Sequence, residues 1–391
     1  MLFVTIVLDG VGIGEQPDAT AYGDHGSDTL GHVLAVERPN LPNLERMGLG
    51  RIRPLEGVTA VSDPTASFGK MTERSAGKDS TIGHWELAGL CLSNPFPTYP
   101  GGFPAEVIDA FCERADYERV LGNRAESGTS IIDNFGREHL ETGIPIVYTS
   151  ADSVFQIAAH VDVISVEKLY ELCQFVRDEI CVDAHGVGRV IARPFQGTEG
   201  SFQRLSNKRK DFSRMPESRT LQTALYAKGI TTVSVGKVAD LFGGEGFARS
   251  TKTTSNSDGI EVTIREIARA QDEDAKTFIW VNLIDFDQEF GHRNNAAGFA
   301  NSLEEFDRAL PAILSALPRG SRLVLTADHG NDPTTPSTDH SREYVPLLYY
   351  GSGASVDLGT RATFADHAAT VADYFQVSFA SEGTSFEPSS I

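Results

Sequence analysis

Three apolar runs that each end in acidic residues constrain the fold of this chain most. Residues 3–8 are followed by Asp9, residues 278–284 by Asp285 and Asp287, and residues 322–325 by Thr326-Ala327-Asp328-His329. Short apolar, β-branched runs are typical of strands that are buried on both faces of a parallel sheet. Because the carboxyl ends of parallel strands meet at one edge, where open α/β sheets bind ligands, we expect these acids to gather there.

Helical and strand patterns alternate through the second half of the chain. We expect helices at 220–228, 258–270 and 301–317, and strands at 231–235, 278–284, 322–325 and 345–349. This alternation predicts an α/β fold with a doubly wound, mostly parallel sheet and helices on both faces. A short helix at 41–48 and a helix that starts near His84 complete the N-terminal part.

Two breaks indicate an inserted domain. The first is the Pro- and Gly-dense segment 94–104, and the second is the basic stretch 207–211, which leads to Pro216. Between them lie helical patterns at 106–118 and 166–179 and strands at 144–149 and 188–192. Because 391 residues exceed one hydrophobic core, we expect a core of residues 1–94 and 216–391 and an inserted α+β cap domain of residues 95–215.

The composition excludes several classes of partner. There are 34 basic and 54 acidic side chains, a net charge of −20, which argues against binding to nucleic acid or anionic membranes. The four cysteines form no C-x-x-C pair, and the apolar start stops at Asp9 without a basic leader. No apolar stretch approaches the length of a membrane span. A cytoplasmic protein is the expectation.

Carboxylate and imidazole groups recur at the predicted strand ends. His340 follows Asp328 and His329 out of a Pro-rich loop, and His292 follows Asp287 closely. Oxygen and imidazole donors suit Mn, Zn or Mg. The residues form two candidate metal groups: Asp9, Asp328 and His329 in one, and Asp287, His292 and His340 in the other. The alternatives are a helix N-cap for Asp9 and a polar surface loop for the histidines.

Ser80 lies in a Gly-flanked loop that runs into a helix. Unpaired N–H groups and the dipole stabilise an anion at a helix N-terminus, so a phosphate ester on this hydroxyl would be well placed. A hydroxyl between two divalent ions is also activated as a nucleophile without a histidine base. The alternative is that Ser80 or Asp79 merely caps the helix.

Longer motifs carry a family resemblance. They comprise residues 9–14 (Asp-Gly-Val-Gly-Ile-Gly), 77–80 (Gly-Lys-Asp-Ser), 83–86 (Gly-His-Trp-Glu), 148–153, 188–195, 285–287, 326–332 and 338–340. The chain resembles the phosphopentomutases of the alkaline phosphatase superfamily. The resemblance implies a metal-binding core, a cap domain and two Mn²⁺ ions, with Mg²⁺, Co²⁺ or Zn²⁺ as substitutes. It also implies a phosphorylated threonine whose place Ser80 takes here, with the neighbouring Thr81 as the alternative.

The resemblance also implies the substrate contacts. Candidate residues for the sugar are Ser150, Asp152 and Val154, and Arg189 is the first choice for the distal phosphate. The further candidates are Arg193, Lys208, Arg209 and, from the core, Lys237. Structural roles are the alternative: Asp152 capping a turn, Arg189 in a salt bridge, and Arg193 supporting the strand.

The implied reaction interconverts ribose 1-phosphate and ribose 5-phosphate, or the 2-deoxy pair, through a phosphoserine enzyme primed by a sugar bisphosphate activator. The expected partner is a small sugar phosphate, and the expected assembly is a monomer or a weak oligomer. One rival is a related mutase or phosphatase for another sugar phosphate, for example in nucleoside secondary metabolism. A rival from another class is a regulatory protein that binds metal or phosphosugar without turnover.

Overall fold

The computed structural model describes residues 1–150, 153–351 and 353–387. The chain divides into two compact units, Met1–Asn94 with Pro216–Ile391, and Pro95–Met215. We call the first the sheet unit and the second the inserted unit, and describe each by itself. The metal-binding and substrate-binding roles expected of the two units stay predictions.

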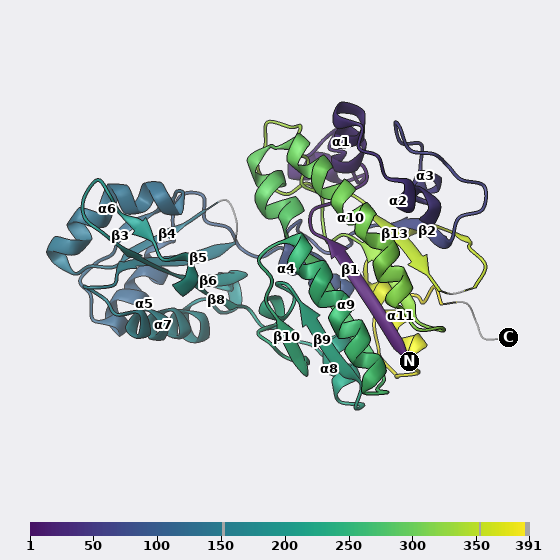
Figure 1. The fold of residues 1–391 in the computed structure, drawn as a ribbon. Coiled ribbons are helices and arrows are strands. Elements are labelled where there is room, and N and C mark those ends of the chain that lie inside the picture. The colour runs from purple at the N-terminus through teal and green to yellow at the C-terminus, as the bar shows by residue number, and fades with distance from the viewer. Residues whose placement is uncertain (151–152, 352, 388–391) are drawn as a thin grey trace. The chain divides into compact units, whose positions relative to one another are not determined.

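One large sheet forms the middle of the sheet unit (Figure 1). Its strands in the described ranges are β1 (Leu2–Leu8), β2 (Ala66–Met71), β9 (Thr231–Val235), β10 (Arg249–Thr251), β11 (Thr277–Leu283), β12 (Arg322–Thr326), β13 (Val345–Tyr350) and β14 (Asp357–Arg361). Their order is β10-β9-β11-β1-β12-β13-β2-β14. From β10 to β12 all neighbours are parallel, whereas β13 is antiparallel to both β12 and β2. The predicted α/β class with a mostly parallel sheet is confirmed.

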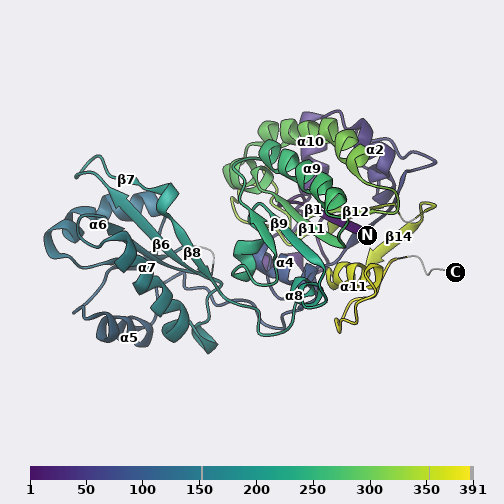
Figure 2. The same ribbon diagram turned by 60° about the horizontal axis from the view of Figure 1, so that its bottom comes forward.

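Helices cover both faces of this sheet. Figure 2 shows α9 and α10 on one side of the central strands and α4, α8 and α11 on the other. Every residue of β1 and β11 is therefore buried, as their apolar sequences require. The helices are α1 (Thr29–Glu37), α2 (Pro42–Met47), α3 (Leu49–Ile52), α4 (Ser80–Leu87), α8 (Leu221–Tyr226), α9 (Asn256–Asp272), α10 (Ala296–Ala316) and α11 (Ala365–Tyr374). Short helical turns are η1 (Ala19–Tyr22), η5 (Ala239–Phe242), η6 (Phe286–Phe290) and η7 (Gly291–Arg293).

The inserted unit is built on a second sheet of order β3-β4-β5-β6-β7, with β8 paired to β6. The strands are β3 (Leu121–Ala125), β4 (Ile146–Thr149), β5 (Val154–His160), β6 (Arg189–Gln196), β7 (Gln203–Arg204) and β8 (Lys210–Ser213). Its helical elements are α5 (Ala105–Ala115), α6 (Gly128–Thr142), α7 (Val166–Phe175), η2 (Val176–Ile180), η3 (Asp183–His185) and η4 (Ser206–Lys208). The sequence patterns did not indicate α6, β5 or the shorter strands β3, β7 and β8.

Two predicted helix boundaries were wrong. α4 begins at Ser80 rather than near His84, because the side chain of Asp79 accepts the N–H groups of Thr81 and Ile82 and so caps the helix there. α10 begins at Ala296 rather than at residue 301, because Asn295 caps it through the N–H of Gly298. In both cases a local cap, rather than the apolar period, sets the first turn.

His367 of α11 joins the helical layer to the central strand. Its Nδ1 donates to the carbonyl oxygen of Leu87 at 2.8 Å, and its Nε2 lies 2.7 Å from the hydroxyl of Thr5. The ring is completely buried. Burial lowers the pKa of His367 from 6.5 to about 4, so the imidazole is neutral in the folded chain at neutral pH.

The lowered pKa of His367 predicts that the folded chain loses stability as the pH falls. As the pH falls from 6.5 towards 4, only the unfolded chain binds a proton at His367, which removes up to about 3 kcal/mol of stability. His367→Gln keeps a donor and an acceptor but cannot titrate. Calorimetric Tm values of wild type and His367→Gln should therefore converge as the pH is lowered through this window. A Tm difference that does not vary with pH would contradict a buried neutral imidazole.

Candidate metal centre and phosphorylation site

The candidate site lies where β11, β1 and β12 end. These strands are adjacent and parallel, and the register pairs Leu8 with Leu283 and Val7 with Thr326. The residues that follow the three strands therefore emerge at one edge of the sheet. This edge carries the carboxylates of Asp9, Asp287 and Asp328, all of them buried.

The first group of potential ligands is Asp9, Asp328 and His329. One ligand atom from each lies within 4.8 Å of the others. His329 Nε2 is 3.4 Å from Asp9 Oδ1 and 3.4 Å from Asp328 Oδ2. The N–H of Gly10 donates to Asp328 Oδ1 at 3.1 Å and so fixes the orientation of that carboxylate.

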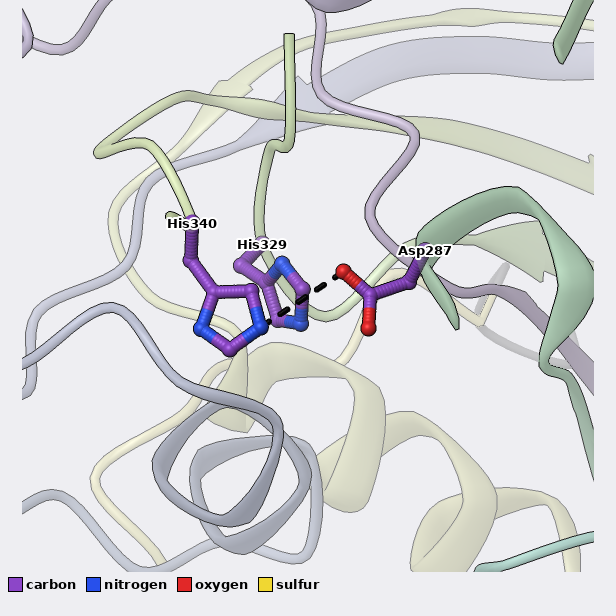
Figure 3. A group of neighbouring side chains, drawn as sticks. All are labelled: Asp287, His329 and His340. Carbon is purple, nitrogen blue, oxygen red and sulfur yellow. Dashed lines mark ion pairs between the residues drawn. The ribbon is translucent and has the colours of Figure 1, made fainter. Parts of the chain in front are cut away.

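The second group is Asp287, His329 and His340 (Figure 3). The side chains converge, and His340 Nε2 is 3.5 Å from Asp287 Oδ1. His292 lies beside this group, with its Nε2 3.3 Å from Asp287 Oδ2 and its ring centroid 4.8 Å from that of His340. The geometry thus adds His329 to the group expected from sequence and makes it common to both.

Burial and charge oppose each other at this edge. Burial disfavours a charged imidazole, but the carboxylates of Asp328, Asp9 and Asp287 outweigh it and raise the pKa of His329 to about 10. Although burial raises the pKa of Asp328, the charges of His329, His84 and Lys237 lower it more, so the net pKa lies below its ordinary value. Buried carboxylates require compensating positive charge, so the edge is a cation-binding environment.

The residues present fit divalent ions. Asp9 Oδ1 is buried and makes no hydrogen bond among the described residues, and its one ion-pair partner there is His329 Nε2 at 3.4 Å, so this oxygen has room for a further positive partner. Carboxylate oxygens and imidazole nitrogens are the donor set that Mn²⁺, Mg²⁺ and Zn²⁺ accept. A metal ion and a proton cannot both occupy Nε2 of His329. Binding of the ion through this nitrogen therefore releases a proton.

Ser80 places its hydroxyl against both groups. It is the first residue of α4, and its Oγ lies 3.1 Å from His329 Nε2. Lys237, which follows β9, donates to the same Oγ at 2.8 Å, and its Nζ lies 2.5 Å from Asp9 Oδ2. Burial works against the charge on Lys237, but Asp9, Asp287 and Asp328 raise its pKa, so the ammonium persists. Sequence reasoning placed Lys237 near phosphate but missed its contact with the serine.

Two residues that support the ligands were not singled out for that role from the sequence. His84 Nδ1 lies 2.9 Å from the carbonyl oxygen of Ser80 and 3.2 Å from Asp328 Oδ2, so it links the serine to a candidate ligand. Asn331 Nδ2 donates to Asp287 Oδ1 at 2.7 Å, and its backbone N–H donates to Gly10 O at 2.9 Å. Outer contacts of this kind orient metal ligands. The position of Asn331 directly after Asp328-His329-Gly330 was the available signal.

The inserted unit brings together several of the candidate phosphate ligands. Arg189 and Arg209 both pair with Asp211, at 3.3 and 2.7 Å. Arg193 Nη2 donates to Gln156 Oε1 at 2.7 Å, and its buried Nε has no hydrogen-bond partner in the described part of the chain.

The remaining candidates of the inserted unit are more scattered. Val154 is the buried first residue of β5, Ser150 is partly exposed after β4, and Lys208 is exposed at the end of η4. Asp152 lies outside the described residues.

Comparison with known proteins identifies the superfamily and the family of the chain. Residues 1–379 match the model of the metalloenzyme superfamily. A phosphopentomutase from Acetivibrio thermocellus is 52% identical over 387 residues, covering 98% of each chain. Phosphopentomutases from Caldanaerobacter subterraneus subsp. tengcongensis (51% identical, 98% of this chain and 96% of the relative) and Syntrophotalea carbinolica (52%, 96% and 94%) match similarly. The chain belongs to the phosphopentomutase family, within that superfamily of metalloenzymes, and is thus an isomerase.

Solved structures give a weaker likeness. Phosphoglycerate mutase of Leishmania mexicana aligns over 98% of this chain and 97% of its own, with a TM-score of 0.49 and 11% identity. The PH0037 protein of Pyrococcus horikoshii aligns over 96% and 97%, with a TM-score of 0.49 and 14% identity. Likeness at this level does not specify a shared activity. Within the described ranges, the helices lack the combination of length and apolar character needed to cross a bilayer.

The shared position of His329 predicts unequal losses of metal. His329→Ala should lower the affinity of both sites for Mn²⁺, whereas His340→Ala should lower the affinity of only one. Each loss should be at least about 10–100-fold, because changing even a residue that only orients a metal ligand has an effect of this size. Calorimetric titration of metal-stripped protein with Mn²⁺ measures both affinities. His185→Ala, in the inserted unit, is the control and should bind as wild type does. Loss of a single ion in His329→Ala would contradict the shared position.

Proposed function

We propose that the chain interconverts ribose 1-phosphate and ribose 5-phosphate, and the 2-deoxy pair, by passing a phosphoryl group through Ser80. Membership of the phosphopentomutase family supports the pentose substrate. The observation that carries the serine assignment is the position of Ser80 Oγ, 3.1 Å from His329 Nε2 and 2.8 Å from Lys237 Nζ. The neighbouring Thr81 is 4% exposed and gives its N–H to Asp79, which favours Ser80 as the modified residue.

The proposed cycle has two phosphoryl transfers. In the first, the bond between phosphorus and Ser80 Oγ breaks while a bond to a free hydroxyl oxygen of the sugar monophosphate forms. The proton of that hydroxyl ends on Ser80 Oγ, and a sugar bisphosphate results. In the second, the other phosphate returns to Ser80, which leaves the isomeric monophosphate. Because an unphosphorylated serine cannot begin this cycle, a sugar bisphosphate is the expected activator.

Lys237 stabilises the serine oxygen in this proposal. Its ammonium group donates to Ser80 Oγ and is held in place by Asp9. As the phosphoryl group leaves, negative charge develops on Oγ, and a positioned cation in a buried site lowers the energy of that state. The carboxylates of Asp9, Asp287 and Asp328 raise the pKa of Lys237 against the effect of burial, so its ammonium group is charged.

We propose two divalent ions, Mn²⁺ in the first instance, with Mg²⁺, Co²⁺ or Zn²⁺ as substitutes. Asp9, Asp328 and His329 would hold one, and Asp287, His292 and His340 the other, with His329 close to both and Ser80 beside them. When bound, such ions neutralise the charge of a transferred phosphoryl group and lower the pKa of a nearby hydroxyl.

We propose that the inserted unit binds the phosphate that is not being transferred. Arg189, Arg193 and Arg209 lie around the single carboxylate of Asp211, a formal charge of 3 − 1 = +2 in a chain of net charge −20. Guanidinium groups bind phosphate with two parallel hydrogen bonds, so they suit this role. Ser150, Asp152 and Val154 stay predictions for the sugar, and Lys208 for its phosphate.

Mass spectrometry of the intact protein tests the serine. After incubation with Mn²⁺ and a ribose or glucose bisphosphate, wild type should gain the mass of one phosphoryl group, and Ser80→Ala should gain none and lose turnover. Ser80→Thr preserves a hydroxyl and should remain phosphorylated. Thr81→Val is the matched control and should behave as wild type does. A phosphate on Thr81, or full turnover in Ser80→Ala, would exclude Ser80 as the carrier.

A panel of sugar phosphates separates this function from its rivals. Each sugar phosphate is assayed for the isomer and for free phosphate with the same enzyme preparation. Isomerisation of pentose phosphates with little release of phosphate is the expected result. Dominant phosphate release would indicate a phosphatase, preference for another sugar would indicate a related mutase, and binding without turnover would indicate a regulatory protein.

Arg189→Met tests the phosphate role of the inserted unit. Loss of a charge-assisted contact of about 1.5–3 kcal/mol should raise the KM for ribose 5-phosphate by about 10–100-fold. If the contact is equal in ground and transition states, kcat should change much less. Arg137→Met, an exposed arginine of α6 paired with Glu141, is the control. An unchanged KM in Arg189→Met would exclude a phosphate-binding role for this arginine and leave it a structural one, such as its salt bridge with Asp211.

Setting and assembly complete the proposal. The net charge of −20 disfavours nucleic acid and anionic membranes as partners. A cytoplasmic location and a monomeric or weakly oligomeric state stay predictions, and light scattering of the purified protein over a range of concentrations tests the second.

A further inference from the structure

Arg342 is buried in the sheet unit, and its guanidinium group is bound to three backbone carbonyls. Nη1 donates to the carbonyl oxygens of Ser75 at 2.8 Å and Gly77 at 2.7 Å, and Nη2 donates to that of Glu73 at 2.7 Å. The side chain is only 3% exposed. These three carbonyls belong to residues 73–77, the segment that leads directly into α4.

Two carboxylates hold the guanidinium in this orientation. Glu73 Oε2 lies 2.9 Å from Nη1 and is itself buried, and Asp18 accepts from Nη2 at 3.1 Å and from Nε at 3.2 Å. The ring of Tyr22 lies 4.8 Å from the guanidinium carbon. Because a buried charge is tolerated only with such partners, and because the guanidinium fork is rigid, the group has one defined position.

A second link joins the same segments. The backbone N–H of Arg342 donates to Asp24 Oδ2 at 2.9 Å, and Lys78 Nζ donates to Asp24 Oδ1 at 3.0 Å. Lys78 also lies 3.3 Å from Asp339. Residues 73–78 are thus bound to residues 339–342 directly and through residues 18–24. We call this set of contacts the Arg342 clamp.

We propose that Arg342 is a positioning residue, which fixes the segment leading to Ser80 against the loop that carries His340. The inference rests on the proposed function, in which Ser80 carries the phosphoryl group. The side chains that make these contacts, those of Asp18, Asp24, Glu73, Lys78, Asp339 and Arg342, are neither candidate metal ligands nor candidate substrate contacts.

The reacting groups come from two different loops. Ser80 is held by residues 73–79, whereas His329 and His340 are held by another loop, closed by the backbone pair of Gly330 and Ser341. The reaction requires the serine oxygen and the ligands of both ions in one geometry, and a misplacement of 1 Å can reduce a rate about 100-fold. Since the clamp joins the two loops, its loss should lower kcat and leave the KM for sugar phosphate nearly unchanged.

Arg342→Lys tests the clamp in the full-length enzyme with Mn²⁺. Lysine keeps the charge but has a single nitrogen in place of the planar fork, so it cannot reproduce the contacts that Nε, Nη1 and Nη2 make together. We expect kcat and the rate of Ser80 phosphorylation to fall about 100-fold, with the KM for ribose 1-phosphate changed by less than about 2-fold.

Arg322→Lys is the matched control. Arg322 starts β12 at the end opposite the site, where it donates to the carbonyl oxygens of Gly320 and Gly351 and pairs with Glu387. The Arg322→Lys variant loses the same kind of contacts as Arg342→Lys. It should therefore have a lower Tm than wild type, with a kcat within about 2-fold of the wild-type value.

The outcomes separate the clamp from the proposed function. Peptide mapping of wild type comes first, and a phosphate elsewhere than Ser80 would overturn the proposed function itself. If the phosphate is on Ser80, the kcat of Arg342→Lys is compared with that of Arg322→Lys. An equal or smaller fall in Arg342→Lys would overturn the positioning role of Arg342 and leave the proposed function standing. If Arg342→Lys does not fold, Lys78→Met breaks only the second link, and we expect an intermediate loss of about 10-fold in kcat. Wild-type kcat in folded Lys78→Met would then also overturn the clamp.

Discussion

The structure depends on three carboxylates that are buried at the ends of adjacent parallel strands. Asp9, Asp287 and Asp328 follow β1, β11 and β12, and this edge leaves them nearly inaccessible to water. Buried carboxylates without compensating charge cost several kcal/mol each. His329 and Lys237 supply part of that charge, and divalent ions supply the rest when bound. The same positive charges that make this edge stable are therefore the ones that make it able to act on a phosphoryl group.

Supporting contacts convert this cluster into a defined geometry. His84 connects Asp328 to the carbonyl of Ser80, and Asn331 connects Asp287 to the backbone after Asp9. Glu343 accepts hydrogen bonds from the N–H of Gly14 and from both the N–H and the hydroxyl of Thr29. These bonds hold the segment after β1 to the segment that precedes β13. Asp9, Asp287 and Asp328 thus follow strand ends, whereas His292 and His340 lie in turns and loops that polar side chains hold in place.

The strand ends could be predicted from the sequence because burial on both faces makes them read as apolar runs that stop at acids. Asp9, Asp287, Asp328 and His329 were found this way. The sharing of His329 between two groups could not be, because it depends on ring positions within a few ångströms. Arg342 gave no local signal, since an arginine in a polar loop reads as exposed until its carbonyl partners are known. The pairing of Arg189 with Asp211 likewise depends on strands β6 and β8 being neighbours.

The position of the inserted unit has an evolutionary consequence. Every strand of the eight-stranded sheet comes from outside residues 95–215, and so do all the candidate metal ligands. The unit interrupts the chain once, between α4 and α8, and has its own sheet and its own apolar core. Residue changes within 95–215 therefore leave the amino acids of the eight strands unchanged. In the proposed function, in which this unit binds the sugar phosphate, selection for another sugar can act on one segment of the gene while the residues proposed for phosphoryl transfer are constrained separately.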